Sequence, residues 1–563
     1  MSALETTTMQ KSRELVFHYL VEDHARRTPG KPCLVMHDRT LTYAEVDEQA
    51  NRWARGLARQ GIGKGDRVLV MIPSGIDHVL IWLGLCKLGA LIVPVNDAYK
   101  GNMLRHQAND SAAGLAIVDE RHLGHWRDIH ASLTHLKAVA VYPDLAPDVE
   151  RGTDWDYFSV QSLCDGLSVQ SLCDGDGSAL PPAVAYYDPM AVFYTSGTTG
   201  PSKGVLYSYA QAHATAAPAA RLCGPDDVFY MFWPMFHVGL SNMFGIVAIA
   251  GATMAIRERF SARNFWLDVR RYRATVTVML STMANFLSAQ PASPGDGDHT
   301  LRKVVLMPLV KDLEAFKARF GCRVSTFYNM TEVSTPLCSD GFDLADAVSC
   351  GRPRPGITAR IVDENDEPVP VGATGELVLR CDNPWEFNLG YWRQPEKTAE
   401  AWRNQWLHTG DAFRRDHAGN FYFVDRLKDA IRRRGENISS HEVEAEVEAH
   451  PAVLESAAVA VPSSTGEDEV KVVAVLKQDV SLQPSELHAF LLARLPAYMV
   501  PRFIEIRTQE LPKTPTGKIR KAVLREEGMR EEGTPQVWDR EHGSPAAGRA
   551  AEQKPVQETT GRT

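Results

Sequence analysis

The chain has 563 residues, of which 44% are hydrophobic and 23% are charged, and its formal net charge is −9. A chain of this length is too long for one hydrophobic core and long enough for two or three domains. The mildly acidic balance argues against nucleic acid as the main partner, because such proteins need a basic surface. The nine cysteines include no C-x-x-C pair, so neither a zinc site nor a disulfide framework is indicated.

The sequence predicts neither a signal peptide nor a membrane span. Residues 1–11 are polar, the apolar stretch 79–95 contains Lys87 and Pro94, and the stretch 243–256 is too short to cross a bilayer. Scattered cysteines suit a reducing compartment. We therefore expect a cytoplasmic protein without a membrane span.

The first hundred residues alternate between helical and strand patterns. Residues 44–60 place apolar side chains at helical spacing, and residues 66–72 and 90–95 favour strands on either side of a helix at 77–88. This β-α-β alternation predicts a mostly parallel sheet with helices on both faces. A tandem repeat at 159–175 is typical of a duplication within a surface loop, and we assign it no function.

The most distinctive stretch is T-S-G-T-T-G-P-S-K-G at residues 195–204, between two apolar strand patterns. Its glycines, hydroxyls and lysine are the composition of a loop that surrounds phosphate oxygens. It is not a Walker A loop, because Gly204 and not Ser or Thr follows Lys203. The candidate phosphate-binding residues are Thr195, Ser196, Gly197, Thr198, Thr199, Gly200 and Lys203.

Residues 230–240 are apolar and aromatic around one histidine, a composition that suits the wall of a binding pocket. Taken alone, the segment favours a core histidine at His237. A resemblance to the adenylate-forming enzymes instead implies that Trp233, His237, Val238 and Gly239 line the acyl pocket.

Several motifs, taken in order, resemble those of the adenylate-forming enzymes, which include acyl-CoA synthetases, nonribosomal adenylation domains and luciferases. They are the loop at 195–204, F-Y-N-M-T-E at 327–332, W-L-H-T-G-D at 406–411, the stretch 422–444 and P-K-T-P-T-G-K at 512–518. The resemblance covers roughly residues 14–525. It is closest to the bacterial carnitine/crotonobetaine–CoA ligase-like group.

The resemblance implies roles for five residues of the middle motifs. Tyr328 would stack on adenine, Thr331 would bind the α-phosphate as part of the catalytic machinery, and Glu332 would hold Mg²⁺. Asn329 replaces the family's glycine, and asparagine tolerates a left-handed backbone better than most residues. Asp411 would bind both ribose hydroxyls.

The later motifs imply roles at the end of the chain. Arg426 would reach the ribose, Lys428 would be the interdomain hinge, and Lys518 would be the catalytic lysine that bridges the substrate carboxylate and the α-phosphate. A solvated basic face is the alternative interpretation of residues 432–434. The candidate residues of the CoA path are Arg433, Gly435 and Glu436.

The implied fold class is α/β. A large N-terminal domain of mixed, mostly parallel sheets is layered with helices, and a small, mobile α+β domain follows it. The expected boundaries are a flexible N-terminus at 1–13, the large domain at 14–424, the hinge at 425–428, the small domain at 429–525 and a disordered tail at 526–563.

The implied function is that of an AMP-forming carboxylate–CoA ligase that uses ATP, Mg²⁺ and CoA. Amino-acid-activating members have an aspartate where this chain has His237, so we expect an acid without an α-amino group. L-M-P-L at 306–309 replaces a glycine-rich segment that borders the acyl group, and the acid stays open. Two alternatives remain: an enzyme that loads a separate acyl carrier protein, and a catalytically silent nucleotide-binding relative. The oligomeric state also stays open, with a homodimer as one assembly.

Overall fold

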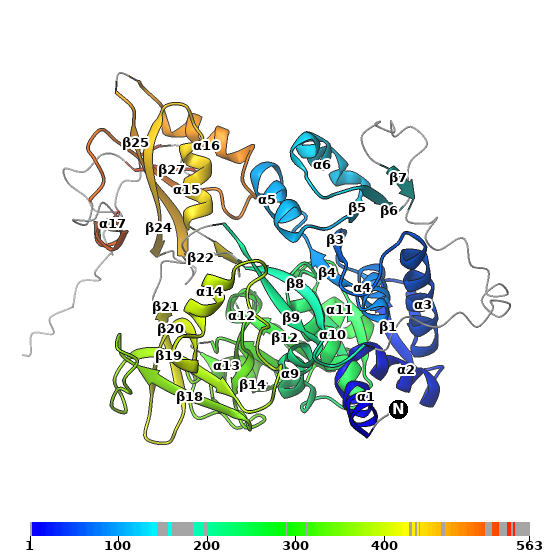
Figure 1. The fold of residues 1–563 in the computed structure, drawn as a ribbon. Helices are drawn as coiled ribbons and strands as arrows, with labels where there is room; N and C mark the ends of the chain where they lie inside the picture. Colours follow the sequence, from blue (N-terminus) through cyan, green and yellow to red (C-terminus); the bar gives the residue numbers. More distant parts are fainter. Residues whose placement is uncertain are drawn as a thin grey trace, which may run out of the picture. The chain divides into compact units, whose positions relative to one another are not determined.

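The computed structural model describes residues 3–143, 156–159, 184–195, 201–288, 290–310, 312–426, 431–433, 436–438, 440–462, 468–478, 480–512, 519, 521–527, 537–541 and 544–545. The chain divides into two compact units (Figure 1). Unit 1 comprises Met1–Ser196 and Ser202–Lys428, and unit 2 comprises Gly197–Pro201 and Asp429–Thr563. Each unit has its own hydrophobic core.

The first sheet of unit 1 has the strand order β7-β6-β5-β3-β4-β8-β9. Every neighbouring pair is parallel except β8 and β9, which form an antiparallel hairpin around the predicted phosphate loop. The expected β-α-β alternation is confirmed, with β3, α4 (Ile76–Leu88) and β4 in sequence. The strands are β3 (Arg67–Met71), β4 (Leu91–Pro94), β5 (Leu115–Asp119), β6 (Ala138–Tyr142), β7 (Asp156–Ser159), β8 (Pro189–Thr195) and β9 (Lys203–Ser208).

The second sheet has the order β14-β13-β12-β10-β11-β1-β2 and is parallel except at the β1–β2 hairpin. One core cluster joins it to the first sheet, because strand residues of both sheets pack on shared apolar helices. The strands are β1 (Pro32–Met36), β2 (Arg39–Thr42), β10 (Val228–Met231), β11 (Thr253–Ile256), β12 (Val276–Leu280), β13 (Lys303–Met307) and β14 (Arg323–Ser325).

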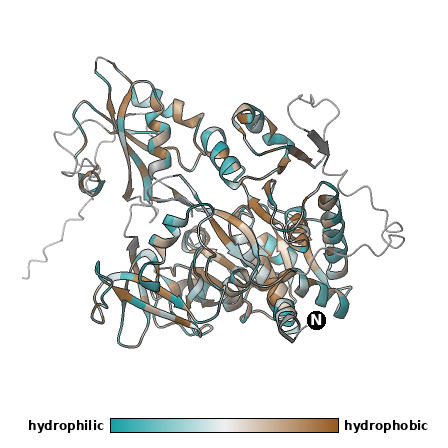
Figure 2. Ribbon diagram, viewed as in Figure 1, coloured by the Kyte–Doolittle hydropathy of each residue, from teal (hydrophilic) through white to brown (hydrophobic). Residues whose placement is uncertain are grey.

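The helices of unit 1 differ in how much of their surface is buried. α4 is apolar on all sides and almost completely buried, as expected for a helix inside the molecule. α3 (Tyr43–Arg59) has one apolar face and starts at a capping box between Thr42 and Glu45. Figure 2 shows hydrophilic colour on α3 and hydrophobic colour on the central strands of unit 1. The other helices are α1 (Ala3–Leu15), α2 (Phe17–Arg27), α5 (Gly101–Ser111), α6 (Leu123–Ile129), α9 (Tyr209–Ala220), α10 (Gly239–Ala250), α11 (Phe265–Tyr272), α12 (Ser281–Ser288) and α13 (Leu313–Phe320).

Two antiparallel sheets complete unit 1, and the candidate adenine and ribose residues Tyr328, Asp411 and Arg426 lie on them. Their strand orders are β15-β16-β17 and β18-β19-β20-β21. The elements are β15 (Phe327–Met330), β16 (Ser334–Cys338), β17 (Arg352–Pro353), β18 (Ile357–Val362), β19 (Gly375–Cys381), α14 (Pro395–Ala401), β20 (Leu407–Arg415) and β21 (Phe421–Arg426).

Unit 2 is an α+β structure with the strand order β24-β25-β26-β27-β28 and a separate β22–β23 hairpin. Lys471 and Glu505 form an ion pair of 2.7 Å between adjacent strands inside it. The elements are β22 (Ile431–Arg433), β23 (Glu436–Ile438), α15 (Ser440–Glu448), β24 (Val453–Pro462), β25 (Asp468–Leu476), α16 (Pro484–Leu492), β26 (Phe503–Arg507), α17 (Lys521–Glu527), β27 (Trp538–Asp539) and β28 (Ser544–Pro545).

The expectation of a disordered tail at 526–563 is wrong for the described residues 526–527, 537–541 and 544–545, which include the end of α17 and the strands β27 and β28. Trp538 and Asp539 pair with β26 as an antiparallel strand. Arg502 Nη2 lies 3.2 Å from Asp539 Oδ2 and 3.0 Å from Glu541 Oε2. Paired backbone groups and a buried carboxylate fix this short segment despite its polar neighbours.

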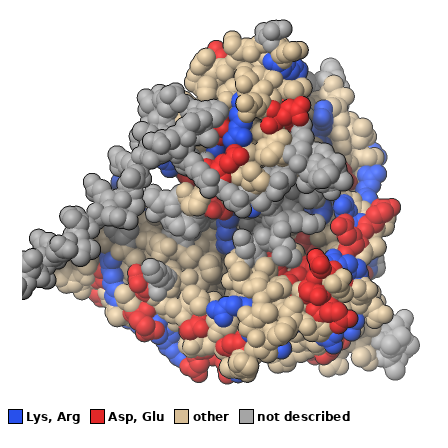
Figure 3. Space-filling model, turned by 90° about the vertical axis from the view of Figure 1, so that its left-hand side faces the viewer, with Lys and Arg blue, Asp and Glu red and all other residues tan. Residues whose placement is uncertain are grey.

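On the face that Figure 3 presents, basic and acidic residues alternate among uncharged ones, without a continuous basic area in its described part. Within the described part of the chain, no helix is long and apolar enough to cross a membrane.

Gly351, just before β17, provides a test of the packing in unit 1. Its φ is +87°, and a Cβ there would lie 2.1 Å from the carbonyl carbon and oxygen of Cys338. We expect Gly351→Ala to lower the free energy of unfolding of unit 1 by about 3 kcal/mol, because left-handed strain adds to overpacking. Gly341→Ala is the matched control, since Gly341 has φ +59° and no atom within 4 Å. Thermal unfolding of both variants measures the difference, and equal shifts would contradict the packing argument.

Candidate active site

The first group of site residues gathers around Tyr391. The Tyr391 hydroxyl donates a hydrogen bond of 3.0 Å to Glu332 Oε1. The Lys203 ammonium lies 5.0 Å from the centroid of the same ring. Glu332 is only 6% exposed. Burial of the Tyr391 phenol, together with the neighbouring Glu332 carboxylate, raises the pKa of Tyr391 well above its ordinary value. The phenol therefore stays protonated and remains a donor.

Backbone hydrogen bonds explain why Tyr391 meets Glu332 and Lys203. The segment 388–392 runs along β9: Leu206 N donates to Gly390 O at 2.9 Å, and Trp392 N donates to Gly204 O at 2.7 Å. Gly204 is needed for this approach, because a Cβ there would lie 2.6 Å from Val192 Cγ1 and 3.2 Å from Trp392 Cβ.

The same segment also holds the turn that contains Thr331 and Glu332. Asn388 N donates to Glu332 O at 2.9 Å. The buried Gln211 side chain of α9 donates to Thr331 O at 2.7 Å. Sequence reasoning missed Tyr391, because a tyrosine after Leu389-Gly390 has no chemical pattern of its own.

A second group joins Tyr328 of β15 to Asp411 of β20. The Tyr328 hydroxyl donates a hydrogen bond of 2.7 Å to Asp411 Oδ2, although the two residues are 83 positions apart. Phe413 supports the ring edge-to-face at 5.0 Å. Asp411 is also the β-ladder partner of Arg426. The structure thus brings Tyr328, predicted for adenine, into contact with Asp411, predicted for ribose, and pairs Asp411 with the strand of Arg426.

Asn329 lies at an irregularity of β15 between the paired residues Tyr328 and Met330. A left-handed backbone, which asparagine would tolerate at this position, occurs instead at Ser334, whose φ is +60°.

The candidate pocket residues lie in one turn that leads into α10. Trp233 Nε1 donates to Val278 O at 2.8 Å, and the His237 ring lies 4.5 Å from that of Phe236. A Cβ on Gly239 would make ordinary contacts of 3.5 Å with Pro234 O and 3.7 Å with Trp233 Cβ. Val238 is the residue before the helix, and its carbonyl accepts from Asn242 N at 3.0 Å.

Arg433 differs from a solvent-facing cation. It is 1% exposed, and its guanidinium lies 2.7 Å from Glu469 and donates to the carbonyls of Tyr498 and Val500 at 2.9 Å each. A carboxylate and two carbonyls therefore replace its hydration shell inside unit 2. Glu436 is half-buried and faces Arg433 across the β22–β23 hairpin.

Several candidate residues lie outside the described residues, so their predicted roles stay predictions. They are Ser196, Gly197, Thr198, Thr199, Gly200, Lys428, Gly435, Lys518 and the side chain of Arg426. Thr195 is described, and it is the β-ladder partner of Lys203 at the mouth of the β8–β9 hairpin.

The described donors suit a cation that is shared with substrate phosphates. Among them, no group of three or more His, Cys, Asp or Glu side chains gathers as a closed metal centre. Mg²⁺ is commonly held by one or two carboxylates and by phosphate oxygens of the substrate. A single buried carboxylate at Glu332, beside Lys203, fits that chemistry.

Known proteins match both units. The family model of AMP-binding enzymes matches residues 21–392, and that of the AMP-binding enzyme C-terminal domain matches residues 442–518. A crotonobetaine/carnitine–CoA ligase from Citrobacter koseri is 33% identical over 502 residues, which cover 86% of this chain and 93% of that protein.

Two solved structures share the fold. The amide bond synthetase McbA from Marinactinospora thermotolerans has a TM-score of 0.77 and 24% identity, over 91% of this chain and 99% of that chain. An o-succinylbenzoate CoA synthetase from Bacillus subtilis has a TM-score of 0.76 and 23% identity, over 92% and 99% of the two chains.

Proposed function

The chain belongs to the AMP-binding enzyme family and is an AMP-forming acyl-CoA synthetase, and we propose that it activates a carboxylic acid without an α-amino group and transfers the acyl group to CoA. The main support is that the Glu332 carboxylate and the Lys203 ammonium both contact Tyr391, one at its hydroxyl and the other at its ring. A carboxylate and a lysine fixed beside one phenol are suited to a polyphosphate and its cation.

The proposed reaction starts when the substrate carboxylate attacks the α-phosphorus of ATP. The bond to pyrophosphate breaks, and an acyl-adenylate forms. Two anions must approach each other, so the site needs positive charge and oriented donors. Lys203 and the loop at 195–204 would hold the departing pyrophosphate, and Thr331 would bind the α-phosphate. When bound at Glu332, Mg²⁺ would neutralise phosphate charge.

Tyr328 and Asp411 would hold the nucleoside. The Tyr328 ring presents an aromatic face for adenine. A carboxylate has two oxygens and can accept from both ribose hydroxyls. The Tyr328–Asp411 hydrogen bond would keep the adenine and ribose contacts in register, and Arg426 would add a donor from the neighbouring strand.

The second step would transfer the acyl group to the thiol of CoA, with AMP as the leaving group. We propose that unit 2 moves about Lys428 between the steps, so that Lys518 serves the first and residues 432–437 serve the second. Domain closure of this kind gates a reaction. Because Arg433 is buried in unit 2, Gly435 and Glu436 are the better candidates for direct contact with CoA.

The acid lacks an α-amino group in this proposal because His237 occupies the position of the ammonium-binding aspartate. The relatives named crotonobetaine/carnitine–CoA ligases make trimethylammonium acids the first class to test. The described cysteines are free, which supports the proposed cytoplasmic location.

Mass spectrometry of one mixture tests the proposal. The mixture contains ATP, Mg²⁺, CoA and a pool of carboxylic acids, with and without enzyme. We expect a new acyl-CoA together with AMP, and the mass identifies the acid. An acyl-adenylate without a thioester would favour a separate carrier protein as acceptor. Nucleotide binding without AMP release from any acid would favour a catalytically silent relative.

A further inference from the structure

The strand that contains Asp411 has an irregularity beside this residue. Glu376 of β19 pairs with Ala412, and Val378 pairs with His408. The interval of four residues from His408 to Ala412 on β20 therefore lies opposite the interval of only two residues from Glu376 to Val378 on β19. Such a bulge removes backbone groups from the ladder and redirects a side chain. The residues in the bulge are Thr409, Gly410 and Asp411.

Two side chains replace the missing ladder contacts. Glu376 Oε1 accepts a hydrogen bond of 2.9 Å from Gly410 N. The Thr409 hydroxyl donates to Leu377 O at 2.7 Å and accepts from Asp411 N at 3.1 Å. Gly410 has φ +71°, a left-handed conformation that these contacts hold in place.

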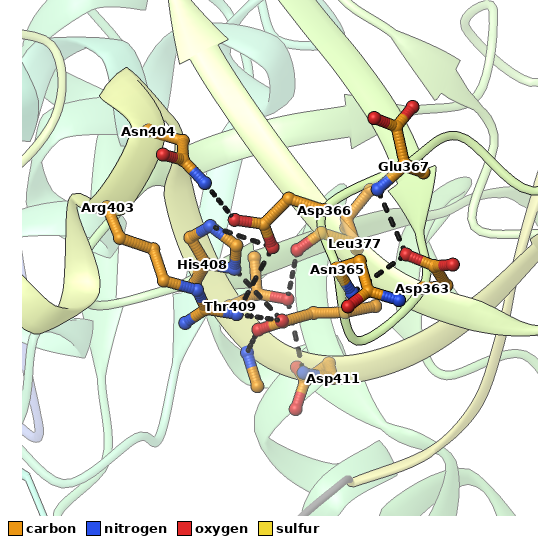
Figure 4. A network of polar contacts seen from close by, with 12 residues as sticks. Asp363, Asn365, Asp366, Glu367, Leu377, Arg403, Asn404, His408, Thr409 and Asp411 are labelled. Atoms are coloured by element: carbon orange, nitrogen blue, oxygen red, sulfur yellow. Dashed lines mark hydrogen bonds and ion pairs between the residues drawn. The ribbon is translucent and has the colours of Figure 1, made fainter.

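The Glu376 carboxylate is in turn fixed from the other side by His408 and Arg403, which Figure 4 shows beside Asp366 and Asn404. His408 Nδ1 lies 2.9 Å from Glu376 Oε2, and Arg403 Nη2 donates to the same oxygen at 3.0 Å. Asp366 binds Arg403 and Asn404 and completes the cluster. Because the Glu376 side chain is only 11% exposed, it has little freedom to leave Gly410.

We propose that Glu376 is a positioning residue that sets the ribose contact of Asp411 through the backbone of Gly410. The proposal rests on the proposed function, in which Asp411 binds the ribose hydroxyls. Without Glu376 the bulge loses the acceptor for Gly410 N, and the Asp411 carboxylate loses its fixed alignment with Tyr328. Displacement of a binding group by about 1 Å can cost about 10²-fold in rate.

The measurement is the preference for ATP over 2′-deoxyATP, expressed as a ratio of kcat/KM values in the complete ligase reaction. We expect Glu376→Ala to lower this preference by about tenfold, the effect of a lost hydrogen bond to a charged group. Glu376→Gln retains an oxygen that accepts from Gly410 N, so it should restore most of the preference. An equal loss for both nucleotides in Glu376→Ala would overturn the proposal.

Asp363→Ala is the matched control. The Asp363 carboxylate also accepts from backbone N–H groups, those of Asn365 and Glu367 at 2.9 and 3.0 Å, and it lies in the neighbouring turn. We expect it to leave the nucleotide preference unchanged. If Glu376→Ala does not fold, Glu376→Asp is measured instead. Its carboxylate keeps the charge but is too short to reach Gly410 N, so an unchanged nucleotide preference in Glu376→Asp would overturn the proposal.

The variant Asp411→Ala distinguishes the ribose role of Asp411 from the positioning role of Glu376. We expect Asp411→Ala to abolish the preference for ATP over 2′-deoxyATP. In the double variant, Glu376→Ala should then cause no further change in this preference, as required for residues that act through one contact. If Asp411→Ala keeps the wild-type preference, the ribose role of Asp411 fails. If Asp411→Ala abolishes the preference and Glu376→Ala does not reduce it, only the positioning role of Glu376 fails.

Discussion

Lys518→Ala is expected to lower the rate of acyl-adenylate formation by at least about 10²–10³-fold, the usual effect of removing one preorganised group that stabilises transition-state charge. The loop P-K-T-P-T-G-K at 512–518 would present this lysine between the substrate carboxylate and the α-phosphate. Without its charge, two anions must approach each other with less compensation. Thioester formation from a supplied acyl-adenylate should remain largely intact, because no new anion then approaches the phosphate.

The two half-reactions are measured separately. Pyrophosphate release reports on the first, and acyl-CoA formation from synthetic acyl-adenylate reports on the second. Lys513→Ala is the matched control, since Lys513 is a lysine of the same loop without a predicted contact with the reacting groups, and it should leave both rates unchanged. Equal losses in both half-reactions of Lys518→Ala would contradict the division of labour between the two steps.

Glu332→Gln is expected to reduce adenylate formation by about 10²-fold and to raise the Mg²⁺ concentration that the reaction needs, because a neutral amide is a poor ligand for a hard cation. The amide keeps the size of the buried side chain, so the fold should persist. Tyr391→Phe should have a smaller effect, of about tenfold. It keeps the ring beside Lys203 and removes only the hydroxyl that orients Glu332.

Mg²⁺ titration of pyrophosphate release measures the rate effect, and calorimetry of MgATP binding gives a readout independent of turnover. Glu396→Gln is the control, because Glu396 is an exposed carboxylate in the first turn of α14. A Glu332→Gln enzyme with an unchanged Mg²⁺ midpoint and unchanged MgATP affinity would refute the proposed cation site.

Local patterns predicted those features of the chain that depend on neighbouring residues. The alternation of β3, α4 and β4 was predicted from hydrophobic periodicity, because apolar residues recur at a different spacing in a helix than in a strand. The strands on either side of the phosphate loop followed from apolar runs that flank a glycine-rich segment. Family motifs added the candidate residues Tyr328, Glu332 and Asp411.

Contacts between distant segments could not be predicted in the same way. Nothing near Tyr391 in the sequence indicates that its hydroxyl meets Glu332, 59 positions away. Arg433 lies in a basic run that was assigned to the CoA path, with a solvated face as the alternative, yet Glu469 holds it inside unit 2. Trp538 lies in a polar tail, but pairing with β26 orders it.

Short motifs and local periodicity were sufficient to predict the fold class, the family and the main candidate residues. Which side chains meet, and which residue orients another, depends on the tertiary structure. Glu376 and Gly410 are 34 positions apart, and their hydrogen bond exists only because β19 and β20 pair with a bulge at Asp411. Pairing register is a property of the assembled sheet, and a short stretch of sequence does not specify it.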